Sequence, residues 1–91
     1  MLLLPATITA REANDTRRLL VQALRVESGA AVVVDASNLQ QFDSSALAVL
    51  LECGRAAAAD GKSISLRHAP EKLTALARLY GVETLLAPPA I

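Results

Sequence analysis

Apolar and polar positions along the chain predict three strands separated by helices. Residues 2–9 are mostly apolar and end in three β-branched residues, and residues 31–35 contain three consecutive valines, a run typical of a strand covered on both faces. Residues 62–68 instead alternate between apolar and polar positions, which indicates a strand with one wetter face. Pro5 places the first strand at a sheet edge, or marks the beginning of that strand.

Helical periodicity fills the intervals between these strands. The first helix is expected from a cap at Asn14 or Asp15 to about Glu27, and the last from Pro70 in its first turn to a cap at Gly81. Apolar residues recur on each helix at the spacing of one face, so both helices should pack against the sheet. The positions expected to be buried are Leu19, Leu20, Ala23, Leu24, Leu73, Leu76, Ala77 and Tyr80.

The middle helix has the clearest start signal in the chain, after a loop at residues 37–41. Asp43 is placed to cap this helix, because its carboxylate can accept a hydrogen bond from a backbone amide of the first turn. Phe42 and Leu47 have the spacing of a hydrophobic staple, and Gly61 supplies a left-handed residue at the end. The stripe expected to be buried consists of Leu47, Leu50, Leu51, Gly54 and Ala58.

The order of these elements is β-α-β-α-β-α. Consecutive β-α-β units favour right-handed crossovers and parallel pairing, so the sequence predicts an α/β fold with a small, mostly parallel sheet covered by helices. The chain length suits a single domain spanning residues 1–91. Residues 82–86 either pack on this domain or form a short final strand, and the proline-containing residues 87–91 are expected to form a flexible tail.

Charge and composition exclude several functions. Nine basic and nine acidic residues cancel, and aromatic residues make up 2% of the chain, so neither a basic stripe for nucleic acid nor a stacking platform for bases is expected. The chain starts without the features of a signal peptide, and no stretch approaches the ~20 apolar residues of a membrane span. Together with the single cysteine, these features predict a cytoplasmic protein that does not bind nucleic acid.

Side chains suited to catalysis or metal binding are few, and each has a structural interpretation. His68 stands alone at a predicted strand end, with no cysteine or carboxylate at ligand spacing. Cys53 lies in the middle of an apolar helix, where it acts as a small hydrophobic residue. Asp35 and Asp43 suit a loop cap and a helix cap, with no nucleophile or base beside them. We therefore expect no enzyme activity, no metal and no cofactor.

Ser44 and Ser45 lie in the first turn of the predicted middle helix. Free backbone amides and the helix dipole favour negative charge at this position, so the dipole would tolerate a phosphate on Ser44 while the neighbouring Asp43 would oppose it. Two interpretations remain open from the residues alone. Both serines either solvate the start of the helix or form a functional site.

Residues 32–37, Leu39 and residues 42–50 together resemble the signature of STAS domains, the family of anti-sigma factor antagonists. In that signature a strand ends in Asp, and a loop leads to an Asp-Ser-Ser/Thr-Gly-Leu-Gly motif at the start of a helix. Residues 76–82 more specifically resemble MlaB-type STAS proteins, the small cytoplasmic subunits of the Mla phospholipid-transport ABC complex. The resemblance extends over residues 31–86 and is weak before them.

This resemblance implies a role for Ser44. The matching position carries the phosphorylated residue in the sigma-factor regulators, whereas in MlaB-type proteins a Thr or Ser there touches the ATPase subunit. The family's two glycines are Ala46 and Ala48 in this chain, and glycines let a partner's backbone approach closely. A kinase-type partner would meet two extra methyl groups, which favours constitutive docking over a phosphorylation switch.

Two functions are therefore expected from the resemblance. In the preferred one, Asp43, Ser44 and Ser45 bind the ATPase of an ABC transporter for phospholipid trafficking, through which the domain reaches the inner membrane. In the alternative, the domain binds a serine kinase or an anti-sigma factor and is phosphorylated on Ser44. STAS chains mostly open with two strands, whereas residues 2–9 have room for one, so an open sheet edge is expected to let the isolated domain form a homodimer.

Overall fold

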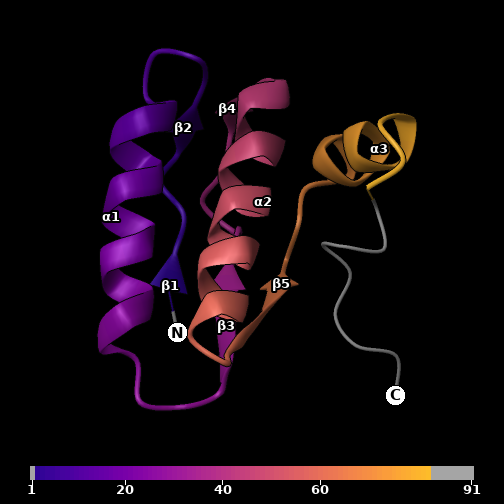
Figure 1. Ribbon diagram of the computed structural model, residues 1–91. Coiled ribbons are helices and arrows are strands. Elements are labelled where there is room, and N and C mark those ends of the chain that lie inside the picture. The colour runs from indigo at the N-terminus through magenta and orange to yellow at the C-terminus, as the bar shows by residue number, and fades with distance from the viewer. Residues whose placement is uncertain (1, 83–91) are drawn as a thin grey trace.

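The computed structural model describes residues 2–82, in which three helices pack with two small sheets (Figure 1). The expected α/β class is confirmed. The elements in chain order are β1 (Leu2–Leu3), β2 (Thr7–Ile8), α1 (Ala13–Val26), β3 (Ala31–Asp35), β4 (Gln41–Phe42), α2 (Ser44–Ala59), β5 (Ser63–Arg67) and α3 (Glu71–Leu79).

The main sheet has the order β1-β3-β5, and both pairings are parallel, as the alternation of strands and helices predicts. Its register places Val34 of the central strand between Leu2 and Leu66. Each crossover therefore carries a helix, and the carboxyl ends of the three strands lie at one edge of the sheet (Figure 1).

The N-terminal segment corrects the prediction of a single strand at residues 2–9. The chain forms β1, turns at residues 4–6 and forms β2, which pairs in parallel with β4 in a second sheet. Pro5 has no backbone N–H with which to continue the first ladder. The Ala6 carbonyl instead accepts hydrogen bonds from the amides of Gln40 and Gln41, at 2.8 and 2.9 Å. The expected loop at residues 37–41 consequently ends in a strand, and the chain does open with two strands.

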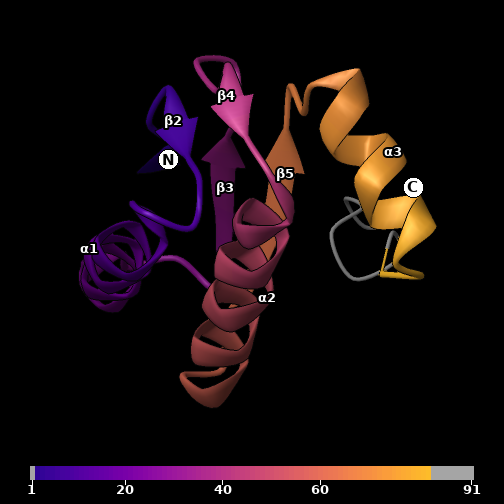
Figure 2. The same cartoon turned by 90° about the horizontal axis from the view of Figure 1, so that it is seen from above.

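Helices cover one face of the main sheet within residues 2–82. Figure 2 shows α1 and α2 on the same side of the strands and α3 beyond the β5 edge. Val32 and Val34 are accordingly buried, whereas Val33 between them is only partly buried. The expectation that residues 31–35 are covered on both faces is therefore wrong for the part of the chain that the structure describes.

Helix α2 supplies the largest share of the core, but its buried stripe differs from the expected one. Leu51 and Gly54 are only partly buried and Ala58 is exposed, because α2 packs against α1 as well as against β5. That second contact turns its buried face toward α1. The buried residues of α2 are Ala46, Leu47, Val49, Leu50, Cys53 and Ala57.

The two outer helices leave large apolar side chains at the surface. Leu19 of α1 is 66% exposed, because Thr16, Leu20 and Leu24 make up the buried stripe of that helix and Leu19 lies on its flank. Tyr80, also expected in the core, is 57% exposed, because α3 ends at Leu79. Both residues correct the predicted core.

The helix termini follow local chemistry. Helix α1 starts at Ala13, so the predicted caps at Asn14 and Asp15 are wrong. The Glu12 carboxylate instead accepts a hydrogen bond from the Thr9 amide at 2.9 Å. This is the side-chain contact of a capping box that begins at Thr9. Helix α3 starts at Glu71, one residue after Pro70. Gly61 and Gly81 both have φ of +71°, which confirms their predicted left-handed role after α2 and α3.

Some expectations concern residues outside the described range. The proposed packing or final strand at residues 82–86 lies outside it except for Val82, and the expected tail at residues 87–91 lies outside it entirely. For residues 2–82, the longest apolar helix is too short to cross a membrane.

Candidate functional site

The start of α2 is built on the cap that the sequence predicts. An Asp43 carboxylate oxygen accepts a hydrogen bond from the Ser45 amide at 2.8 Å, and the Asp43 carbonyl accepts from the Ala46 amide at 3.0 Å. The Asp43 amide donates to the Ile8 carbonyl at 3.4 Å, so β2 also holds this residue in place. The cap therefore has a fixed position relative to the second sheet.

Asp43, Ser44 and Ser45 lie together at the surface, as the sequence predicts from their adjacency. Asp43 and Ser44 are exposed and Ser45 is partly buried, whereas Ala46 and Leu47 directly after them belong to the core. Two exposed polar residues thus stand at the end of a helix whose next residues are anchored in the interior. A surface of this kind changes little on binding, because its backbone is held by packing.

The hydrogen bonds from the Ser45 amide and hydroxyl lower the pKa of Asp43 below its ordinary value. Asp43 is therefore anionic at neutral pH and occupies the positive end of the α2 dipole. A phosphate on Ser44 would place a second negative group beside this carboxylate.

The two alanines that replace the family's glycines have different surroundings. Ala46 is completely buried, so its methyl group packs in the core and cannot meet a partner. Ala48 is exposed, one helical turn after Ser44. The expectation that a partner meets two extra methyl groups is therefore wrong for Ala46. For Ala48, whose methyl group is at the surface, it stays a prediction.

Sequence reasoning missed a contact between α3 and the start of α2. The Lys72 ammonium lies 5.9 Å from the centre of the Phe42 ring, within the range of a cation–π interaction. Phe42 directly precedes Asp43, so this contact brings the first turn of α3 next to the capping residue. Thirty positions separate Lys72 from Phe42, and no local pattern in the sequence joins them.

His68 has a carboxylate partner that the sequence analysis did not anticipate. Its Nδ1 lies 3.4 Å from an Asp35 carboxylate oxygen, while the other Asp35 oxygen accepts from the Ser37 amide at 2.8 Å. The Ser37 hydrogen bonds, and then His68, lower the pKa of Asp35. His68 itself is exposed and has φ of 59°, the left-handed conformation that reverses the chain after β5.

This Asp35–His68 pair lacks the remaining parts of a catalytic site within residues 2–82. The imidazole of His68 makes no further hydrogen bond there to a serine, threonine or cysteine that could act as a nucleophile. Asp35 instead orders the loop that follows β3 through the Ser37 amide, as the loop-cap interpretation predicts.

Cys53 is buried within α2, as its apolar surroundings predict. Burial raises the pKa of the Cys53 thiol to about 11, so the reactive thiolate is scarce at neutral pH. No cluster of three His, Cys, Asp or Glu side chains suited to a metal ion exists within residues 2–82.

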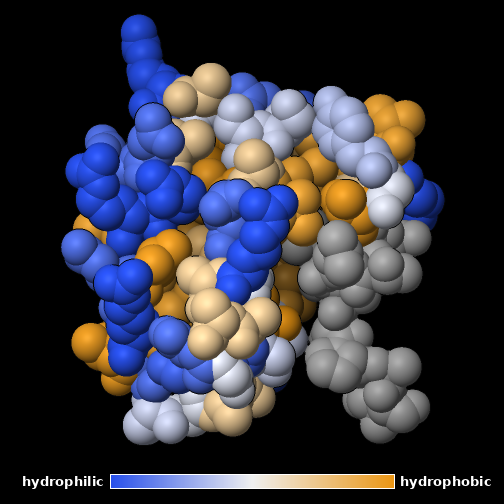
Figure 3. All heavy atoms as spheres, in the orientation of Figure 1, coloured by the Kyte–Doolittle hydropathy of each residue, from blue (hydrophilic) through white to orange (hydrophobic). Residues whose placement is uncertain are grey.

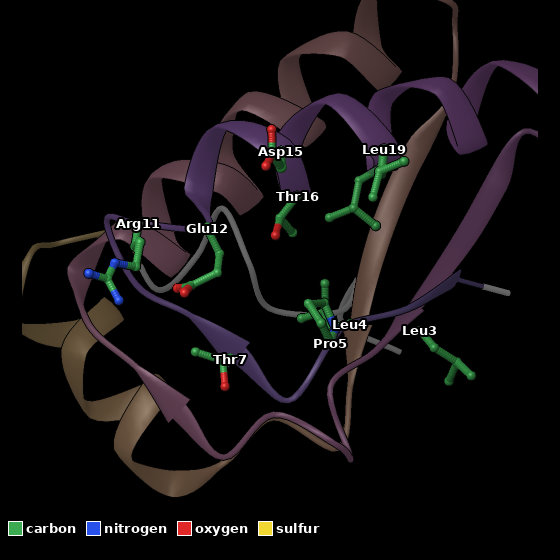
Figure 4. A pocket seen from close by; sticks show the side chains of 10 residues that line it. Leu3, Leu4, Pro5, Thr7, Arg11, Glu12, Asp15, Thr16 and Leu19 are labelled. Carbon is green, nitrogen blue, oxygen red and sulfur yellow. The ribbon is translucent and has the colours of Figure 1, made fainter.

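Two hollows lined by described residues lie away from the start of α2. One, of about 530 Å³, lies between α2 and β5 and includes Gly54, Ile64 and Val82. The other, of about 660 Å³, lies between α1 and the N-terminal strands. Figure 4 shows Leu19 on one wall of this second hollow and Pro5 on the other.

The chain matches a protein-family model described as Mlab, STAS domain, over residues 1–87, and it therefore belongs to the MlaB-type STAS family. The match starts at residue 1, so it includes the N-terminal strands, where the resemblance seen in the sequence is weak. No curated protein matches the chain. Domains of this family mediate protein–protein interactions and are generally non-enzymatic regulators.

Proposed function

We propose that this MlaB-type STAS domain binds the ATPase subunit of an ABC transporter for phospholipid trafficking, and stabilises or regulates it. Asp43, Ser44 and Ser45 form the centre of the contact. On this proposal the domain works in the cytoplasm and reaches the inner membrane only through the ATPase.

One observation carries the proposal: the exposed polar start of α2 stands on a rigid base. Ser44 is accessible, while Ala46 and Leu47 are fixed in the core. Within residues 2–82 the Ser44 hydroxyl makes no hydrogen bond, so it can offer a donor and an acceptor to a partner. A preorganised surface of this kind suits stable docking, because little order has to be created on binding.

Partner switching through phosphorylation of Ser44 is the second candidate. The exposure of Ser44 favours it, since a kinase must reach this hydroxyl. The anionic cap at Asp43 opposes it, because a phosphate on Ser44 would be held beside a carboxylate. Constitutive docking accounts for both features, and we prefer it for that reason.

Co-purification tests the proposal. The domain is co-expressed with the ATPase subunit of an Mla-type ABC transporter, and the tagged ATPase is recovered. We expect the wild-type domain to be retained and Ser44→Glu to be retained at least about tenfold less. Leaving a buried polar group without its hydrogen bond typically costs ~1–3 kcal/mol, and an unpaired charge buried in the contact costs more.

Ser28→Glu is the matched control, because Ser28 is also exposed but lies in the turn after α1. This variant should bind like the wild type, and circular dichroism should show both variants folded. Undiminished retention of Ser44→Glu would remove Ser44 from the interface. Failure of the wild-type domain to bind the ATPase would contradict the proposed function itself.

A further inference from the structure

We infer that a second copy of this chain docks on the outer flank of α1, so that two copies form a twofold dimer in which Leu19 of each packs against Val26 of the other. The inference goes beyond the proposed function, since no ATPase takes part in the contact. Leu19, Gln22 and Val26 carry it, and we call these three residues the α1 stripe.

The α1 stripe is a second face on a helix whose core face is already packed. The core face consists of Thr16, Leu20 and Leu24, whereas Leu19 is 66% exposed and Val26 is 81% exposed. Positions 19, 22 and 26 are spaced i, i+3 and i+7, so they lie along one side of the helix. This side of α1 therefore carries more apolar surface than the core of its own chain uses.

The α1 stripe lies on the same side of the molecule as the unpaired edge of β1. Leu19 lines the hollow between α1 and the N-terminal strands, together with Leu3 and Pro5 (Figure 4). Figure 2 shows α1 at one end of the helix layer, beside α2 and on the same side of β3 as the N-terminus. Figure 3 shows apolar surface at the outer edge of the molecule, in the part where Figure 1 places the end of α1. Within residues 2–82, β1 pairs only with β3.

Symmetry identifies a second copy as the occupant of this flank. In an antiparallel pair of α1 helices with its twofold axis beside Gln22, Leu19 lies opposite Val26 of the other copy, because three and four positions separate them from Gln22. Figure 1 shows β1 beside the C-terminal half of α1, which contains Gln22, so the same axis brings the two β1 edges toward each other.

The polar chemistry of the α1 stripe also suits its own copy. The two Gln22 side chains meet at the axis, and each amide can donate to and accept from the other. Arg25 is the charged residue between Leu19 and Val26, and its side chain lies about 100° around the helix from Val26. The net charge of zero adds no general repulsion between copies. Since one helix and a two-residue strand form a small contact, we expect the dimer to dissociate on dilution.

Opposite charges at position 22 test the axis. Gln22→Glu and Gln22→Lys each place two like charges together, so each variant alone should associate at least about tenfold more weakly than the wild type in sedimentation or light scattering. An equimolar mixture of the two variants pairs a carboxylate with an ammonium and should recover association to within about threefold of the wild type. If each variant alone associates like the wild type, or if the mixture fails to recover, the inference is overturned. A wild-type chain that stays monomeric at every concentration also overturns it.

Cysteine cross-linking tests the register. Under mild oxidation, a mixture of Leu19→Cys and Val26→Cys should give at least about tenfold more covalent dimer than either variant alone. Equivalent positions of the two copies are seven residues, or roughly 10 Å, apart along the helix axis, whereas a disulfide needs Cα atoms within about 7 Å.

Two controls accompany the cross-linking. The wild-type chain carries only the buried Cys53 and should form no covalent dimer. A mixture of Leu19→Cys with Leu79→Cys uses another exposed leucine, on α3, and should give no more dimer than either variant alone. Circular dichroism should show every variant folded, because all substituted positions are exposed. Equal cross-linking of the mixture and of the single variants would contradict the proposed register.

Discussion

Three carboxylates hold the junctions between loops and regular elements, and each does so as an anion. Glu12 accepts from Thr9 before α1, Asp35 accepts from Ser37 after β3, and Asp43 accepts from Ser45 at the start of α2. These hydrogen bonds are the largest cause of the lowered pKa of each group. The charged forms are therefore better stabilised in the folded chain than in the unfolded chain.

This arrangement predicts loss of stability in acid. The pKa of each group is lower in the folded than in the unfolded chain, where the ordinary values are 4.5 for Glu12 and 3.8 for the two aspartates. Their contribution is thus complete above those values and is lost as the pH falls through the folded pKa values. We expect the urea denaturation midpoint to stay level from about pH 7 to about pH 5 and to fall below about pH 4.

Asp43→Asn provides the control for this titration. The amide oxygen keeps the acceptor for the Ser45 amide but cannot be protonated in this range, so the variant should lose less stability in acid than the wild type. If the urea denaturation midpoint falls equally in the variant and the wild type below about pH 4, the charge of Asp43 contributes nothing to this loss of stability.

The candidate site could be predicted from sequence only as far as its residues are neighbours along the chain. Asp43, Ser44 and Ser45 follow one another, and the cap needs only local geometry. Lys72 and His68 reach this end of the molecule through the fold, and their partners Phe42 and Asp35 stand about thirty positions away. Helical and strand periodicity do not encode which elements meet there.

At the scale of elements, the end of α2 depends on backbone conformation. Gly61 has φ of +71°, and a side chain added there would meet no atom within 4 Å, so only the backbone conformation opposes substitution. We expect Gly61→Ala to lower the free energy of unfolding by about 1 kcal/mol, because L-residues pay a steric cost in the left-handed region. Urea denaturation measures this change.

Gly29→Ala is the control for this substitution. Its added methyl group would stand at ordinary contact distance, 3.8 Å from the Ala31 carbonyl oxygen, and the backbone there lies outside the left-handed region. The variant should be as stable as the wild type or slightly more stable, because alanine restricts the unfolded chain. Equal losses in both variants would argue against a conformational cost at Gly61.

The order and type of most elements follow from local patterns, whereas their exact faces do not. Gly61 and Gly81 mark the helix ends that the sequence predicts. The division of residues 2–9 into two strands depends on the Ala6 carbonyl, which accepts hydrogen bonds from residues far along the chain. Leu19 and Tyr80 were assigned to the core because helical spacing alone does not show how wide the packed face is.

At the scale of the whole molecule, the sheet has an open side at β1. This strand pairs only with β3 within residues 2–82, although the chain opens with two strands, because β2 joins β4 instead. Leu3 and Leu19 are both more than half exposed and line the hollow beside this edge, which Figure 4 shows from close by. Unpaired strand edges beside apolar surface favour pairing with another copy.

We therefore expect the isolated domain to self-associate through this edge. Its net charge of zero provides no repulsion between copies, and an arrangement with twofold symmetry would pair one edge with its equivalent. Light scattering should give a mass that rises above 9.5 kDa with concentration. Leu19→Asp should suppress this rise, whereas Leu79→Asp, at a similarly exposed leucine of α3, should leave it unchanged. A mass near 9.5 kDa at every concentration would show that the edge is covered.

Lys62 joins the end of α1 to the strand that follows α2. Its ammonium lies 2.6 Å from the carbonyl oxygens of both Leu24 and Glu27, at the negative end of the α1 dipole. Those contacts span 38 and 35 positions of the chain. During synthesis, all of α2 is therefore made before Lys62, and the last carbonyls of α1 gain this cation only when the residue directly before β5 has been added.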